Sequence, residues 1–195
     1  MSKIDEIKDF HPEERGEWRA WLEKNHDTSP GVWFVYYKKA SGKPRVTYDE
    51  AVEEALCFGW IDSLPRKLDE MRSMLLFTPR KKRSGWSRLN KKRIEKLIEQ
   101  NLMSEAGLKK IEAAKQDGSW NKLDDAEELK IPTDLSNALN ANRIAAKNFA
   151  AFNESVKKGI LGWIGGAKRP ETRTKRIEKT VALAGINKRA MYDSE

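Results

Sequence analysis

The sequence predicts an α+β protein, with a small mixed α/β N-terminal domain over residues 1–125 and a helical C-terminal region over residues 126–195. One basis is an aromatic, β-branched run over residues 31–39, which has the profile of a buried strand. Another is a pair of extended segments between residues 60 and 78. The third is that residues 87–195 have mostly helical periodicity, and strands followed by a run of helices are typical of the α+β class.

The first predicted element is a helix over residues 14–25. Trp18, Trp21 and Leu22 recur there at helical spacing, so one apolar face is expected to dock on a core, and Pro12 suits the start of the helix. The turn sequence DTSPG then leads into the strand over residues 31–39.

A second helix is predicted over residues 48–58. Thr47 and Glu50 have capping-box spacing, and Gly59 allows the left-handed conformation that closes the helix. Its buried stripe is expected to comprise Tyr48, Ala51, Val52, Ala55 and Leu56. Strands over residues 60–67 and 71–78 follow, joined by a turn.

The remaining elements are predicted helices. Ser87 is expected to cap a helix through residue 100, with Ile94, Leu97 and Ile98 inward. Ser104 is expected to cap the next, with Leu108, Ile111 and Ala114 inward. Trp120 is expected to fill the junction, and the acidic stretch 124–128 is interpreted as a linker before helices near 133–141, 143–153, 156–164 and 170–184.

Positive charge is concentrated in two segments. The chain has a net charge of +8, whereas residues 80–100 carry +7 and residues 157–189 carry +8, which leaves the rest at −7. Such segregation suits a protein that meets phosphate, nucleic acid or an acidic protein partner, although solvated helix faces account for it equally well.

The cysteine content and hydropathy exclude several classes. A single cysteine excludes an internal disulfide framework and a cysteine-rich zinc site, and no cofactor or metal is expected. No apolar run approaches the roughly 20 residues that span a bilayer, so no membrane span is expected. The N-terminus lacks the apolar core of a secretory signal, which makes the cytoplasm the expected compartment.

Four motifs resemble the YdeI/OmpD-associated protein family. They are CFGWID (57–62), TPRKKRSGWSRLN (78–90), AAKQDGSW (113–120) and AKRPETRTKRI (167–177), and the match extends over nearly the whole length. The resemblance implies a bacterial bacteriocin-protection or stress-response protein of poorly defined activity, with porin association implied by the family name. This chain departs from the expected amphipathic helix before AKRPETR by carrying Gly159, Gly162, Gly165 and Gly166, which disfavour a helix by about 1 kcal/mol each.

The predicted ligand site lies in the CFGWID and PRKKRSGWS motifs. Asp62 is a candidate to orient a neighbouring arginine or to accept a proton, and a structural salt bridge is the alternative. The segment before the helix at residue 87 combines cations, hydroxyls, an open backbone and an aromatic ring, which suits an anion at a helix N-terminus. The predicted ligand-binding residues are Trp60, Asp62, Arg80, Lys82, Arg83, Ser84, Trp86, Ser87 and Asn90.

Catalytic groups are not assigned. Cys57 lies near the C-terminal end of its helix, which disfavours a thiolate, and the two histidines, His11 and His26, make a weak case for a triad or a metal site. A second basic surface is predicted at Lys168, Arg169, Arg173 and Arg176.

Three functions remain open at this point. The first is a non-catalytic protective protein that binds an anionic small molecule or partner through residues 80–90. The second is a nucleic-acid-binding protein that uses the basic helices. The third is an enzyme with an acid/base at Asp62.

Overall fold

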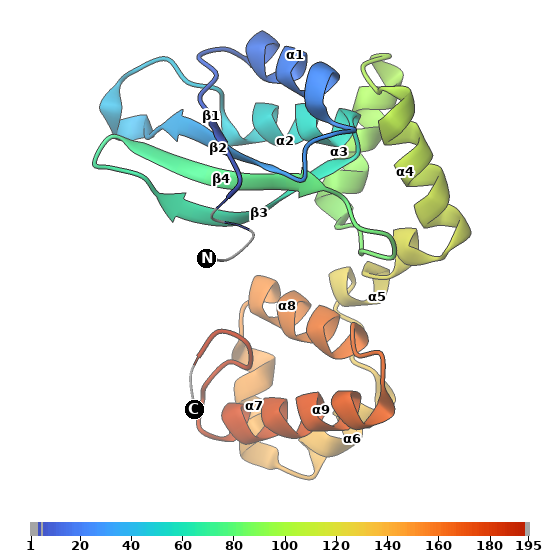
Figure 1. Cartoon of the computed structure of the whole chain (residues 1–195). Helices are drawn as coiled ribbons and strands as arrows, with labels where there is room; N and C mark the ends of the chain where they lie inside the picture. The colour runs from blue at the N-terminus through green and yellow to red at the C-terminus, as the bar shows by residue number, and fades with distance from the viewer. Residues whose placement is uncertain (1–3, 5, 194–195) are drawn as a thin grey trace. The chain divides into compact units, whose positions relative to one another are not determined.

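The computed structural model describes residue 4 and residues 6–193, and the chain in it divides into two units. The first extends to Ser84 and resumes over Leu89–Trp120, and the second consists of Gly85–Arg88 and the chain from Asn121 onward. The first contains a sheet with helices and the second is helical (Figure 1). The predicted α+β class is therefore confirmed.

The sheet of the first unit has four strands in the order β1-β2-β4-β3. The short β1 (Asp9–Phe10) pairs parallel with β2 (Val32–Tyr37), and β2 pairs antiparallel with β4 (Arg72–Pro79). The strand β3 (Trp60–Lys67) pairs antiparallel with β4, with an irregularity between Asp62 and Pro65. The last two strands thus form a hairpin within one residue of the predicted bounds.

Two helices, α1 (Arg15–Asn25) and α2 (Tyr48–Cys57), cover one face of this sheet (Figure 1). The ring of Trp18 is fully buried, and its centroid lies 5.0 Å from that of Phe34 and 5.4 Å from that of Phe77. The indole nitrogen of Trp18 donates to the carbonyl oxygen of Ala51 at 3.0 Å, so a buried polar atom keeps a partner. A short 3-10 helix (Lys39–Ser41) lies between β2 and α2.

The signals at the ends of α2 act as predicted. The side chains and backbone groups of Thr47 and Glu50 form the capping box, and Gly59 has φ +72°. The stripe was assigned correctly at its four aliphatic positions, which are buried. The prediction was wrong at Tyr48, which is 54% exposed. Tyr48 is the first residue of α2 and lies at the edge of the buried face.

Helices α3 (Arg88–Glu99) and α4 (Glu105–Gln116) complete the first unit, followed by a 3-10 turn (Ser119–Asn121). Ser104 caps α4 by accepting from the backbone N–H of Gly107, as predicted. The buried apolar face of each helix is narrower than predicted. On α3, Ile94 and Leu97 are buried but Ile98 is 46% exposed. On α4, Ile111 and Ala114 are buried but Leu108 is 44% exposed.

The second unit contains five helices among the residues that the structure describes. They are α5 (Asp124–Glu127), α6 (Thr133–Asn140), α7 (Arg143–Ala151), α8 (Glu154–Gly165) and α9 (Pro170–Gly185). Their shared core includes the fully buried Leu135, Phe149 and Ile160. The expected linker over residues 124–128 was wrong, because this stretch forms α5 and places Ala126 in that core.

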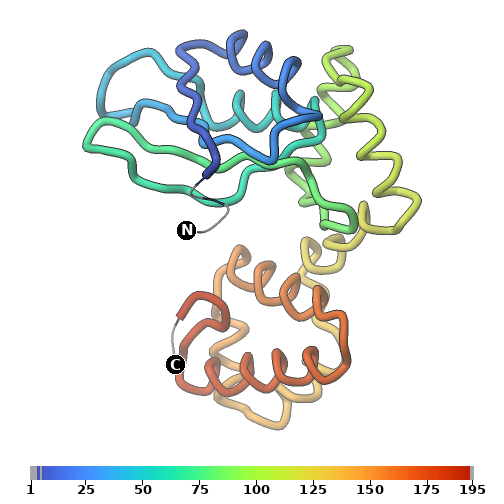
Figure 2. Tube along the Cα trace, viewed as in Figure 1, coloured from blue at the N-terminus to red at the C-terminus, as the bar shows by residue number. Residues whose placement is uncertain are grey.

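The glycine-rich helix α8 forms despite its low helix propensity. The end of the chain returns to it (Figure 2), and the hydroxyl of Tyr192 occupies the space that a Cβ at Gly159 would need. Buried contacts of Val156, Ile160, Leu161 and Ile164 hold the helix in place, so tertiary packing overrides local propensity here.

Candidate functional site

The predicted ligand site is distributed over both units. Arg80 to Ser84 belong to the first unit, whereas Gly85–Arg88 belong to the second. The Trp86 ring is 1% exposed, and Trp60 is equally buried, with its indole nitrogen donating to the carbonyl oxygen of His26 at 3.2 Å. Neither ring is therefore a surface on which a ligand stacks in this structure.

Arg80 is buried rather than presented on the surface. Its backbone N–H donates to the carbonyl oxygen of Gly59 at 2.9 Å, and one guanidinium nitrogen donates to the Ser84 hydroxyl at 3.4 Å. Burial lowers the pKa of Arg80 to about 10, and the negative charge of Asp62 opposes this shift. The charge of Asp62 therefore acts on a buried Arg80.

Asp62 is also engaged by Tyr48, which the sequence analysis assigned to the buried stripe of α2 and not to the ligand site. The hydroxyl of Tyr48 donates to Asp62 Oδ2 at 2.9 Å. Burial, together with the charge of Asp62, raises the pKa of Tyr48 to about 12.

Arg93 links this pair to Asn90. Its guanidinium lies 5.8 Å from the centroid of the Tyr48 ring, donates to Asn90 Oδ1 at 2.9 Å and forms an ion pair with Asp49. Asp62 and Asn90, two of the predicted site residues, are therefore connected through Tyr48 and Arg93. The spacing of Asn90 and Arg93, three residues apart on a helix, is the signal by which this contact could have been found.

The loop before α3 is where the predicted cations are exposed. Lys82 and Arg83 are both exposed, and Arg83 has φ 60°, an uncommon conformation for a residue with a Cβ. The Ser84 hydroxyl donates to the carbonyl oxygen of Lys81 at 2.8 Å, which stabilises the turn. Ser87 is half-buried next to the start of α3.

A second group of cations lies close to this loop. The ammonium of Lys91, on α3, lies 5.3 Å from the centroid of the Trp120 ring, and that of Lys115, on α4, lies 5.4 Å from the same centroid. Trp120 itself is half-buried.

Asp117 contacts both Arg83 of the loop before α3 and Ser119, the residue before Trp120. Hydrogen bonds from the side chain of Ser119 and from its backbone N–H, the latter at 2.9 Å, lower the pKa of the Asp117 carboxyl, and contact with Arg83 lowers it further. We call the group formed by Lys82, Arg83, Lys91, Lys115 and Trp120 the Trp120 surface. Lys82, Arg83 and Lys115 are exposed, and Lys91 and Trp120 are half-buried. Sequence analysis assigned Trp120 to a junction and did not connect it with the basic loop.

The cysteine is buried, and both histidines contact neighbouring residues of the fold. Cys57 is fully buried, and burial raises the pKa of its thiol to about 11, so the reactive thiolate is disfavoured. His26 Nδ1 is 2.9 Å from the carbonyl oxygen of Leu22, and the His11 ring packs on that of Tyr37 with centroids 4.9 Å apart. Among the described residues, no three acidic, histidine or cysteine side chains gather to hold a metal ion.

The second predicted basic surface is partly engaged within the second unit. Arg173 donates to Asp134 through Nε at 2.6 Å and through a terminal nitrogen at 3.0 Å. Arg176 donates to the carbonyl oxygen of Trp163 and lies 5.0 Å from the centroid of its ring. Lys168 and Arg169 are exposed at the start of α9. Within the part of the chain that the structure describes, no helix is sufficiently long and apolar to traverse a bilayer.

Two family models match the chain. One, described as "Domain of unknown function (DUF8412)", matches residues 10–110, and the other, described as "Bacteriocin-protection, YdeI or OmpD-Associated", matches residues 128–185. The resemblance to the YdeI/OmpD-associated family is thus confirmed, but for the C-terminal part rather than for nearly the whole length. Of the four motifs, AKRPETRTKRI lies inside that match. Neither a curated protein nor a solved structure matches the chain.

Proposed function

Because the chain belongs to the family described as a domain of unknown function (DUF8412) and carries a YdeI or OmpD-associated segment over residues 128–185, we propose that it is a protective binding protein. In this proposal it binds an anionic ligand or partner on the Trp120 surface and catalyses no reaction. The protective role is suggested by the bacteriocin-protection description of the family model that matches residues 128–185. The binding is assigned to the positive charges of the first unit.

The observation that carries the proposal is the convergence of Lys91 and Lys115 on one indole ring. The two ammonium groups come from different helices and lie 5.3 and 5.4 Å from the same centroid. Both ammonium groups add to the positive potential around the Trp120 ring, and an anion bound beside them lowers it. The exposed cations of the adjoining loop, Lys82 and Arg83, extend the same field.

A non-catalytic role is supported by the surroundings of the groups that would do chemistry. The Asp62 carboxylate already accepts from Tyr48, and the Cys57 thiol is buried with a raised pKa. A general base has to reach a substrate proton at hydrogen-bond distance, and a nucleophilic cysteine has to be a thiolate.

The test is a titration of the full chain with tripolyphosphate, followed by tryptophan fluorescence at two salt concentrations. The variant Lys91→Gln/Lys115→Gln is expected to weaken binding about tenfold, equivalent to about 1.4 kcal/mol. The variant Trp120→Phe is expected to remove most of the fluorescence change.

The matched control is Lys96→Gln/Lys109→Gln, which removes the same charge from the same two helices. These lysines are already paired, Lys96 with Glu53 at 4.0 Å and Lys109 with Glu105 at 2.6 Å. If both double variants lost affinity equally, the loss would come from the lower net charge of the protein, and this would contradict a site at Trp120. Absence of binding by the unmodified chain would contradict the proposal directly.

Nucleic acid is the second candidate, and the half-buried Trp120 among lysines favours it. Aromatic rings beside cations stack on the bases of single strands. A 12-nucleotide single strand that binds more tightly than tripolyphosphate, with affinity that falls steeply with salt, would support this candidate. Tighter binding of tripolyphosphate would favour the small-anion function.

A further inference from the structure

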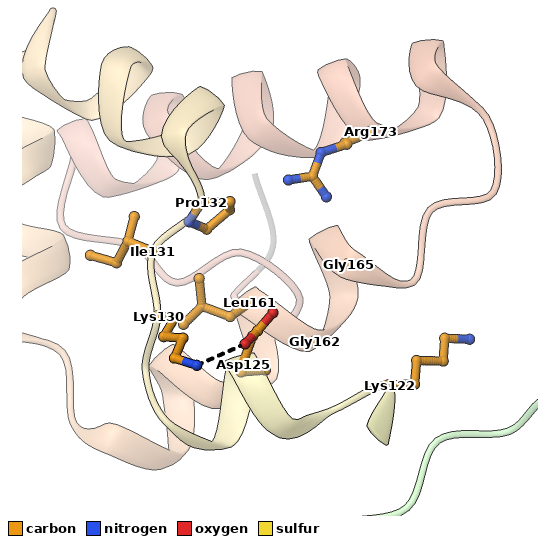
Figure 3. Close-up of a pocket in the computed structure, with 10 residues that line it drawn as sticks. Lys122, Asp125, Lys130, Ile131, Pro132, Leu161, Gly162, Gly165 and Arg173 are labelled. Carbon is orange, nitrogen blue, oxygen red and sulfur yellow. Dashed lines mark hydrogen bonds and ion pairs between the residues drawn. The ribbon is translucent and has the colours of Figure 1, made fainter. Parts of the chain in front are cut away.

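A pocket of about 320 Å³ lies within the second unit (Figure 3). It is lined by Lys122, by α5, by residues 130–132, by the last turns of α8 and by Arg173 of α9. Pockets for small molecules have volumes of roughly 300–1,000 Å³, so the space suits a ligand of modest size. The pocket is independent of the function proposed above.

Two glycines keep one wall of the pocket open. Gly162 and Gly165 lie nearly one turn apart on α8 and both line the space (Figure 3). A Cβ at Gly165 would meet no other atom within 4 Å, so close packing does not require a glycine there. Gly165 is the last residue of α8, and the space beside it opens into the pocket.

The floor of the pocket is apolar. Leu161 is 5% exposed and Ala126 is 9% exposed, and both belong to the core of the unit. Ile131 is 46% exposed at the side of the pocket, next to Pro132. A hydrocarbon group that covers Ile131 would remove apolar surface from water, which is favourable at roughly 25 cal/mol per Å².

Positive groups outnumber negative ones among the lining residues. Lys122, Lys130 and Arg173 line the pocket together with one carboxylate, Asp125. Asp125 is already engaged, because Lys130 contacts it at 3.2 Å across the floor (Figure 3). The lining therefore favours a ligand that brings a negative group of its own.

Arg173 is the group best placed to receive that negative charge. Its guanidinium has five N–H donors: Nε and one terminal nitrogen bind Asp134, and the other terminal nitrogen donates to the carbonyl oxygen of Ile164 at 3.4 Å. The side chains of Arg173 and Asp134 are 32% and 47% exposed, and an ion pair at such exposure contributes only about 0–1 kcal/mol. A ligand carboxylate offers the same planar two-oxygen geometry and can take the place of Asp134.

We propose that this pocket binds a small organic acid, whose carboxylate replaces Asp134 on Arg173 and whose hydrocarbon chain lies against Leu161 and Ile131. The geometry requires both parts of the ligand. An acid without a hydrocarbon chain lacks the apolar contact, and a neutral chain lacks the charge that Arg173 pairs with.

The experiment follows the backbone amide signals of the ¹⁵N-labelled full chain by NMR while hexanoate is added. Hexanoate is expected to shift the amides of Gly162 and Gly165, whereas acetate and hexanol, which each lack one part, are expected to leave them nearly unchanged. Norleucine adds an ammonium to the same chain and is expected to bind no better than hexanoate, because Lys130 already holds Asp125.

Three variants test the site. Gly165→Leu is expected to fill the pocket and abolish the shifts. The control is Gly16→Leu on α1, where a new Cβ would be 4.0 Å from the nearest neighbouring atom, and it is expected to preserve the shifts. Arg173→Gln is expected to weaken hexanoate binding about tenfold. Asp134→Asn is expected to strengthen it about threefold, because the intramolecular competitor loses its charge.

The outcome of Asp134→Asn separates a binding site from a structural ion pair. If Asp134 served only to hold the fold, its replacement would weaken binding together with stability. Equal binding of hexanol, tighter binding of norleucine, or shifts that persist in Gly165→Leu would each overturn the assignment of a small organic acid.

Discussion

The hydroxyl of Tyr48 donates a hydrogen bond to Asp62 Oδ2 at 2.9 Å and so joins the first turn of α2 to β3. Burial first, and then the nearby carboxylate, raise the pKa of Tyr48 from 10.0 to about 12. In the unfolded chain the phenol ionises near its ordinary pKa, and in the folded protein it resists ionisation. Stability from this contact is therefore complete below pH 10 and is lost as the pH rises toward 12.

Tyr48→Phe is expected to make the unfolding free energy less dependent on pH in that window. Urea denaturation of the two proteins at pH 9 to 12 measures this difference. Tyr36→Phe, which removes a hydroxyl from β2, is the control. A decline in stability between pH 10 and 12 that is as steep in Tyr48→Phe as in the unmodified protein would contradict the linkage.

Gly107→Ala is expected to destabilise the first unit by about 3 kcal/mol. A Cβ at this position would overlap with the backbone carbonyl of Cys57, so α4 would have to move away from the end of α2. The loss is measured by thermal or urea denaturation. Gly165→Ala, where a Cβ meets nothing within 4 Å, is the matched control and is expected to be neutral or stabilising.

Glu54→Gln is expected to lower stability by about 2 to 4 kcal/mol. The Glu54 side chain is 4% exposed and accepts from Arg15 at 2.6 Å and from Arg19 at 2.8 Å, so the change removes the counter-charge of two arginines that tie α1 to α2. Its neighbour offers a direct comparison. Glu53→Gln, with a side chain that is 15% exposed and bound to Arg15 at 3.0 Å, should have a smaller effect, and a reversed order would refute the explanation.

The Arg173–Asp134 pair is expected to contribute stability at neutral pH and to lose it in acid. Hydrogen bonding from Arg173 lowers the pKa of Asp134 below its ordinary 3.8, so the contribution is present above that value and is lost as the pH falls further. A double-mutant cycle with Arg173→Gln and Asp134→Asn should give a coupling of about 0.5 kcal/mol at pH 7 and low salt. The coupling should shrink as the pH falls below 3.8, and a value independent of pH would argue against an ionic contact.

Much of the fold was predictable because its signals are local. The capping box at Thr47 and Glu50, the Ser104 cap and the turn at Gly59 depend on groups within a few residues of each other. The strands around residues 60–79 were placed to within one residue for the same reason. Errors occurred where burial depends on a distant element, as at Leu108 and in the stretch 124–128, which forms α5.

The candidate site was less predictable, because side chains that act together come from separate elements. The sequence showed a dense basic loop, but it could not show that Arg80 turns inward or that Lys91 and Lys115 meet at Trp120. The pocket beside Gly165 depends on α5, α8 and α9 at once. The hydrophobic periodicity of one segment does not show which side chains of other segments lie beside it.

By itself, the sequence determined the α+β class, most helix and strand bounds, the segregation of positive charge and the resemblance to a bacteriocin-protection family. The tertiary structure decided which cations are exposed, which carboxylates they meet and where a cavity remains. The physical reason is range: caps, turns and hydrophobic periodicity act over a few residues, whereas burial, pKa shifts and pockets depend on atoms brought together from distant parts of the chain.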